Sequence, residues 1–168
     1  GRYLRAQGGL RKILASYMDR RPEALVFLRG GAGKPYLKDN PLHFNLTTSA
    51  DLALLGVSLA EPVGVDCEQL RPRVEVDGVA RRMFPAEVAE GVIAAPHAER
   101  LELFYRAWTA LEADVKSDGR GLFRRQADPA VDAPRIDHCV PEPGFIAAVA
   151  RVRLPPVEQW RALMLDGT

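Results

Sequence analysis

The chain has 168 residues, 47% of them apolar, which is enough to bury a core and most simply makes one domain or two small halves sharing a core. Its formal net charge of +1 gives no whole-chain field that would favour nucleic acid or an acidic membrane as a partner. No apolar run approaches the ~18 residues of a membrane span and no signal-peptide pattern opens the chain, so we expect a cytoplasmic protein.

The first part of the chain is predicted to contain one helix followed by short strands. Apolar residues recur at helical spacing over residues 3–19, and Arg21-Pro22 ends that pattern. Glycines over residues 30–33, followed by Lys34-Pro35, predict a flexible loop, and residues 47–51 predict a turn. Short apolar runs predict strands at residues 24–28, 42–46 and 52–58.

The second part is predicted to begin with a strand and to be dominated by one long helix. The predicted strands are at 62–68 and 144–152, and the predicted helices at 78–84, 86–93 and 99–116. Pro85 separates the two short helices, and the glycines at 119 and 121 end the long one. Residues 125–143 read as loops with room for an edge strand, and a short terminal helix should contain Trp160 and Leu163.

Two carboxylates on the predicted strand at 62–68 should point the same way. Side chains alternate along a strand, so Asp66 and Glu68 share one face and Cys67 takes the other. Two neighbouring carboxylates repel unless a cation neutralises them, and oxygen ligands alone favour magnesium or manganese. The simpler alternative, which stays open, is an exposed strand end with two solvated acids.

The long helix carries a third carboxylate and a lysine. We predict a core-facing stripe and a neighbouring stripe. The core-facing stripe comprises Phe104, Trp108, Leu111 and Val115. The neighbouring stripe comprises Tyr105, Thr109, Glu112 and Lys116. Glu112 and Lys116 are four residues apart and share a face, which an ordinary surface ion pair would also explain. Their position beside the apolar stripe favours instead a carboxylate held in place to complete a metal site.

Other candidate chemistry finds less support. His43, His97 and His138 have no metal-ligand spacing, and neither Ser49 nor Ser117 has the His–Asp neighbours of a nucleophilic serine. Pro35 after Lys34 excludes a P-loop. The two cysteines, Cys67 and Cys139, lack metal spacing and fit free thiols in a reducing compartment. Residues 1–38 carry nine Lys/Arg against two Asp/Glu, which fits either a polyanion site or a solvated helix face.

Read in order, four motifs resemble those of the surfactin-type 4'-phosphopantetheinyl transferases. They are Gly33-Lys34-Pro35, Asn45-Leu46-Thr47-Thr48-Ser49, Gly64-Val65-Asp66-Cys67-Glu68 and the segment from Trp108 to Gly121. Arg82-Met83-Phe84 with Glu87, and the segment 143–150, are also similar to family patterns. Each motif alone is weak, but four in order at sensible spacing make a specific match over residues 10–150.

The resemblance implies an α+β fold, with two similar α/β halves in a pseudo-twofold arrangement and the active site between them. We place the halves at 1–62 and 63–168 of one compact unit, which we expect to be a monomer. Two-half members carry further strands before the first helix, so the first half is expected to be truncated here. Alternatively a partner supplies those strands, as in the short trimeric holo-acyl-carrier-protein synthases, although the motif spacing favours the longer type.

The resemblance also implies a reaction. The phosphopantetheine arm of coenzyme A moves to a serine of an apo acyl or peptidyl carrier protein, with magnesium (or manganese) at the pyrophosphate and 3',5'-ADP as the leaving group. No nucleic acid or membrane takes part.

The resemblance assigns roles to individual residues by motif position. It implies metal binding by Asp66, Glu68 and Glu112; a general base at Glu112; phosphate binding by Lys116; adenine contact by Lys34 and Pro35; and coenzyme A phosphate contacts by Thr48, Ser49 and a basic residue of the first helix, Arg2 or Arg5.

Two positions depart from the family pattern. Thr48 stands where the family has a phosphate-binding histidine, and Leu111 replaces the lysine before the catalytic glutamate. Each lost charged contact would cost about 1.5–3 kcal/mol. The candidates for compensation are Arg120, Arg124 and Arg125. An active transferase is the favoured function; the alternatives are a degenerate member that binds coenzyme A or a carrier without transfer, and an unrelated magnesium phosphohydrolase.

Overall fold

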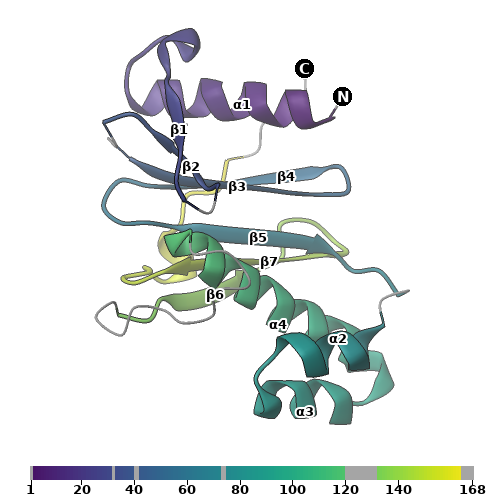
Figure 1. Cartoon of the computed structure of the whole chain (residues 1–168). Coiled ribbons are helices and arrows are strands. Elements are labelled where there is room, and N and C mark those ends of the chain that lie inside the picture. Colours follow the sequence, from purple (N-terminus) through teal and green to yellow (C-terminus); the bar gives the residue numbers. More distant parts are fainter. Residues whose placement is uncertain (1, 32, 40–41, 73–74, 120–131, 164–168) are drawn as a thin grey trace.

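The structure is a computed structural model that describes residues 2–31, 33–39, 42–72, 75–119 and 132–163, with side chains from residue 6 onward. It combines helices with small antiparallel sheets (Figure 1), which confirms the α+β fold class. None of the helices in the described part of the chain has the length and apolar character needed to span a bilayer.

The N-terminal elements pack around one apolar cluster. They are α1 (Arg2–Tyr17), the short helix η1 (Pro22–Ala24), β1 (Phe27–Arg29), β2 (Pro35–Leu37), β3 (His43–Ser49) and β4 (Leu52–Ser58). β1 pairs with β2 and β3 with β4, both antiparallel. Leu10 and Leu14 of α1 are buried against Leu37 and Phe44 of the strands, and α1 lies along the outside of these hairpins (Figure 1).

The C-terminal elements form a three-stranded sheet with α4 packed on it. They are β5 (Gly64–Gln69), α2 (Val76–Met83), α3 (Ala86–Ala94), α4 (His97–Asp118), β6 (Arg135–Cys139), β7 (Phe145–Arg151) and the short helix η2 (Val157–Gln159). The strand order is β5-β7-β6, all antiparallel. α2 and α3 pack at one end of α4 (Figure 1).

Several sequence predictions of local structure are confirmed. β6 is the edge strand expected within 125–143, whose residues up to 131 lie outside the described part. α2 and α3 meet at Pro85 as expected. Gly119 ends α4 with φ +72°, a left-handed conformation that glycine adopts without a Cβ penalty. The predicted boundary between residues 62 and 63 lies in the segment joining β4 to β5, and the division into halves stays a prediction. The pseudo-twofold relation of the halves stays a prediction.

Other local predictions are wrong. Residues 47–49 continue β3 instead of turning, because they pair with Leu52–Leu54 of β4, and only Ala50 and Asp51 make the turn. Pro35 begins β2 instead of ending a loop, since an edge strand tolerates proline at its first position. The strand expected at 24–28 starts at Phe27, and the terminal helix is only the turn Val157–Gln159, which leaves Leu163 exposed.

The buried side of α4 differs from the predicted stripe. Phe104 and Val115 are buried as expected, but Trp108 and Leu111 are only partly buried. They pack toward the cluster that α4 shares with α2 and α3. The fully buried line is instead Tyr105, Thr109, Ala113 and Ser117. Small side chains here let α4 lie close to the sheet, which an apolar periodicity alone does not reveal.

Gly64 shows how close this approach is. A Cβ at Gly64 would overlap the backbone oxygen of Ala113 and the backbone nitrogen of Ser117. The start of β5 and the last turns of α4 therefore touch through their backbones, and this contact holds the acidic residues of β5 beside Glu112 and Lys116.

Candidate active site

The two acids of β5 lie on one side of the strand, as the alternation predicted. Asp66 is only 2% exposed and Glu68 is half-buried. Cys67 points the other way, into an apolar cluster with Phe145 and Ala147. Burial raises the pKa of the Cys67 thiol to about 12, so the thiol stays protonated and is no nucleophile.

Lys116 brings β5 and α4 together chemically. Its Nζ donates to Asp66 Oδ1 at 2.5 Å and lies 3.6 Å from Glu112 Oε2. The structure thus unites Asp66, Glu112 and Lys116, which are up to 50 residues apart in sequence. The Glu112–Lys116 pair is consequently part of a partly buried cluster and not an ordinary surface ion pair.

Burial disfavours the charged form of the carboxyl groups in this cluster, so positive charge nearby is favourable. Burial raises the pKa of Asp66, of Glu68 and of Glu112, and the attraction of Lys116 works against that rise in each case. Asp66 also raises the pKa of both glutamates by repulsion. The Lys116 ammonium thus lies near three carboxyl groups, Arg71 also attracts Glu68, and a further cation would stabilise the charged form of all three.

Hydroxyl groups of β3 hold the same carboxylates. Thr47 Oγ1 donates to Asp66 Oδ1 at 3.1 Å, and Ser49 Oγ donates to Glu68 Oε2 at 2.8 Å. Thr47 was not among the residues predicted for the site, and Ser49 was expected at a coenzyme A phosphate. The polar residues Asn45, Thr47 and Ser49, spaced two apart, were the signal for a polar strand face.

The fit of a metal ion rests on one oxygen. Asp66 Oδ2 is buried and has no hydrogen-bond partner among the described residues, whereas Oδ1 takes two donors. Among the described side chains, no three Asp, Glu, His or Cys converge in ready-made ligand geometry, and Lys116 lies between Asp66 and Glu112. An all-oxygen donor set with an unsatisfied buried oxygen fits a hard divalent cation.

Of the residues expected around coenzyme A, the structure describes the surroundings of Lys34, Pro35, Thr48 and Ser49. Lys34 Nζ donates to Val63 O at 3.0 Å and to Ser117 O at 2.7 Å, so it joins the start of β5 to the end of α4. Thr48 is exposed on the face of β3 opposite to Thr47. The side chains of Arg2 and Arg5, and all of Arg120, Arg124 and Arg125, lie outside the described part.

The buried ammonium of Lys34 gives a pH-dependent prediction. Burial lowers its pKa from 10.5 to about 8, although Asp118 attracts the charge. At a pH between these two pKa values, the folded chain binds fewer protons than the unfolded chain. The contribution of Lys34 to stability should therefore increase as pH rises through this range. The neutral amine keeps two N–H groups for its two carbonyl partners. Urea unfolding of wild type and Lys34→Met, below and above pH 8, measures this. The difference in free energy of unfolding between wild type and variant should shift in favour of wild type as pH rises. A difference that does not change with pH would contradict the prediction.

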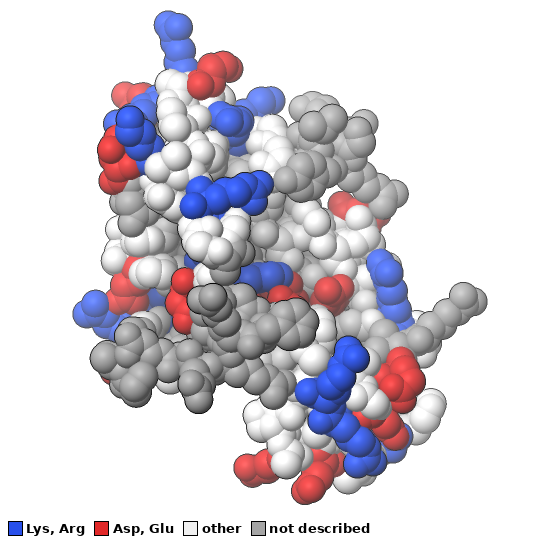
Figure 2. Space-filling model, viewed as in Figure 1, with Lys and Arg blue, Asp and Glu red and all other residues white. Residues whose placement is uncertain are grey.

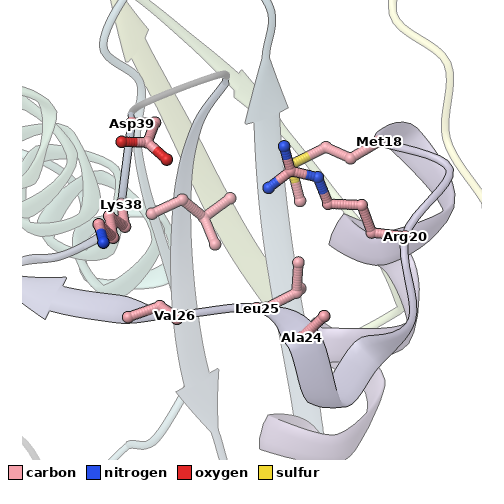
Figure 3. A pocket seen from close by; sticks show the side chains of 8 residues that line it. Met18, Arg20, Ala24, Leu25, Val26, Lys38 and Asp39 are labelled. Carbon is pink, nitrogen blue, oxygen red and sulfur yellow. The ribbon is translucent and has the colours of Figure 1, made fainter.

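A surface depression elsewhere does not belong to this cluster. It lies where the segment after α1 meets β1 and β2, and Figure 3 shows Met18, Arg20, Leu25 and Lys38 among its side chains. None of the predicted site residues lines it. On the face in Figure 2, Lys and Arg side chains are spread over the upper part of the molecule and gather again at the lower end.

Comparisons with known proteins identify the family of this chain. A family model described as the 4'-phosphopantetheinyl transferase superfamily matches residues 62–152, which include β5 and α4. The 4'-phosphopantetheinyl transferase HetI of Nostoc sp. is 32% identical over 165 residues, covering 89% of this chain and 70% of HetI. The chain therefore belongs to the 4'-phosphopantetheinyl transferase superfamily.

Two further relatives carry the same description. AcpT of Escherichia coli is 34% identical, covering 68% of this chain and 57% of AcpT. Sfp of Bacillus subtilis is 30% identical, covering 54% of this chain and 39% of Sfp. As a member of this family the chain is a transferase whose phosphopantetheine donor is coenzyme A.

Proposed function

We propose that the cluster on β5 and α4 transfers the 4'-phosphopantetheine arm of coenzyme A to a serine of an apo carrier protein. The carrier serine Oγ forms a bond to the β-phosphorus, the pyrophosphate P–O bond breaks, and 3',5'-ADP leaves. The observation that carries the proposal is the junction of Asp66, Glu112 and Lys116 within the segment that matches the family. Such chemistry depends mostly on positioning and charge neutralisation.

Glu112 is the general base in this proposal. It accepts the proton of the carrier serine, directly or through one water. Burial raises the pKa of Glu112, which makes it a stronger base than a solvated glutamate. Lys116, 3.6 Å away, holds a phosphate oxygen and offsets the charge that develops on the leaving 3',5'-ADP.

Asp66, Glu68 and Glu112 would hold a magnesium ion, with manganese as a substitute. The ion would neutralise the pyrophosphate when it is bound. The unpaired Oδ2 of Asp66 and the raised pKa of all three carboxyl groups support this assignment. Lys116 at Oδ1 leaves that second oxygen available.

Coenzyme A is proposed to lie along β3 and the segment that begins β2. Pro35 and Lys34 would lie against the adenine, with the Lys34 ammonium engaged by carbonyl groups as described. Thr48 is exposed and therefore accessible to a phosphate, and Ser49 lies beside Glu68 at the edge of the acidic cluster. Arg2 or Arg5 would add positive charge.

Thr48→His tests this placement. A histidine at this position can donate to the 3'-phosphate and, when protonated, attract it, so coenzyme A should bind roughly tenfold more tightly. The 3'-dephospho analogue lacks that group and should gain little. Calorimetric titration of wild type and variant with both ligands gives the comparison. An equal gain for both ligands would contradict the placement of Thr48.

Release of 3',5'-ADP tests the proposed function. With coenzyme A, magnesium and an apo carrier protein, chromatography should show 3',5'-ADP accumulating in proportion to the carrier consumed. A carrier whose acceptor serine is replaced by alanine is the matched control and should give none. Release of free phosphate instead would contradict the proposal and favour a phosphohydrolase.

We also propose that the chain is a monomeric cytoplasmic member of the surfactin-type branch. The order of its four motifs and the match to Sfp support the branch. The cysteines Cys67 and Cys139 are free thiols, which fits a reducing compartment.

A further inference from the structure

The contact between β3 and β5 is made by side chains. In the described part of the chain, β3 pairs by backbone only with β4, and β5 pairs only with β7. Asn45, Thr47 and Ser49, spaced two apart on β3, are each buried to within 7% exposure and reach across to β5. We call these three residues the polar ladder.

Each member of the polar ladder has a defined partner. Asn45 Oδ1 accepts from the backbone N–H of Val65 at 2.8 Å. Ser49 Oγ accepts from the backbone N–H of Gln69 at 3.1 Å while it donates to Glu68 Oε2 at 2.8 Å. The Ser49 hydroxyl therefore both donates and accepts, and turning its proton to another acceptor would leave Glu68 Oε2 without this hydrogen bond.

Thr47 fixes the direction of Asp66. Thr47 and Lys116 both donate to Oδ1, whereas the other oxygen, Oδ2, is buried and has no hydrogen-bond partner among the described residues. Buried polar atoms without a hydrogen-bond partner are rare in folded proteins, and a ligand bound at Oδ2 would account for this geometry. Polar groups that hold metal ligands in this way commonly change metal affinity when removed.

We propose that Thr47 and Ser49 are positioning residues that orient Asp66 and Glu68 toward a divalent cation. This inference rests on the metal site of the proposed function. It adds that hydroxyl groups of β3 set the orientation of the two metal ligands on β5. The same two hydrogen bonds join β3 to β5, so cation binding and the contact between the halves support one another.

Titration with Mn²⁺ alone distinguishes this role from a purely structural one. Binding is measured by the loss of the electron paramagnetic resonance signal of free Mn²⁺. Thr47→Val keeps the shape and removes the hydroxyl, and it should raise the Mn²⁺ Kd about 10-fold or more. Thr47→Ser keeps the hydroxyl and should restore near-normal binding. Ser49→Ala should weaken binding by a similar factor, with some loss of stability from the unpaired Gln69 N–H.

Two buried hydroxyls outside the polar ladder serve as matched controls. Thr109→Val removes a hydroxyl that donates to backbone carbonyl groups of α4, and Ser58→Ala removes one that accepts from the Glu61 backbone. Both should leave the Mn²⁺ Kd within about twofold of wild type. Thermal unfolding of every variant shows whether a changed Kd reflects lost folding.

The outcomes separate this inference from the proposed function. Normal Mn²⁺ binding by folded Thr47→Val and Ser49→Ala would overturn the positioning role while leaving the metal site intact. Equal weakening in the controls would also overturn it. A wild-type protein that transfers phosphopantetheine but binds no Mn²⁺ would overturn the inference and the ligand assignment, not the transfer. Failure of transfer with normal Mn²⁺ binding and the predicted Kd shifts would overturn only the proposed function.

Discussion

Glu112→Gln should lower the transfer rate by about 10²–10⁴-fold while the protein remains folded. The amide keeps the size of the side chain but cannot accept the carrier serine proton as a base. The change also removes a partly buried carboxylate that Asp66 repels, so stability should hold or increase. Single-turnover transfer to an apo carrier, together with thermal unfolding, gives both quantities.

Glu102→Gln is the matched control for this variant. Glu102 lies on the same helix and pairs with Arg106 four residues on, but it is exposed and outside the cluster. An exposed pair of this kind contributes little, so rate and stability should stay near wild type. A Glu112→Gln protein that transfers at a near-normal rate would remove Glu112 from the mechanism.

Asp66→Asn should raise the magnesium concentration needed for half-maximal transfer by more than about 10-fold. The amide oxygen can still accept from Thr47 and Lys116, but the buried site loses the charge that would attract the ion. Asp66 is 2% exposed, so solvent cannot replace the missing ligand. A magnesium titration of the initial rate provides the measurement.

The control for this variant is Asp77→Asn. Asp77 is an exposed acid of α2 that lies 3.6 Å from Arg100. Its replacement removes the same charge from the chain and should leave the magnesium titration unchanged. An unchanged titration in Asp66→Asn as well would show that Asp66 is not a ligand.

The parts of the site that follow from local periodicity were predictable from sequence. Strand alternation put Asp66 and Glu68 on one side and Cys67 on the other, and helical spacing put Glu112 beside Lys116. Motif order then indicated that the two segments meet. The structure confirms this by placing Lys116 between Asp66 and Glu112.

The parts that depend on contacts between distant segments were not predictable. Thr47 and Ser49 looked like turn residues because Thr, Ser and Asp are common in turns, yet pairing with β4 extends the strand through them and their hydroxyl groups bond to β5. Ala113 and Ser117 belong to neither of the predicted stripes, although their small size lets α4 touch β5. Lys34 belongs to a segment predicted to be a loop, whereas its two carbonyl partners lie 29 and 83 residues away in sequence.

Intact-protein mass spectrometry of several apo carrier proteins tests the central claim most directly. After incubation with this chain, coenzyme A and magnesium, at least one carrier should gain the mass of one phosphopantetheine. The gain should disappear with EDTA and with Glu112→Gln. No gain on any carrier, while the chain still binds coenzyme A, would contradict the transferase and leave a member that binds without transferring.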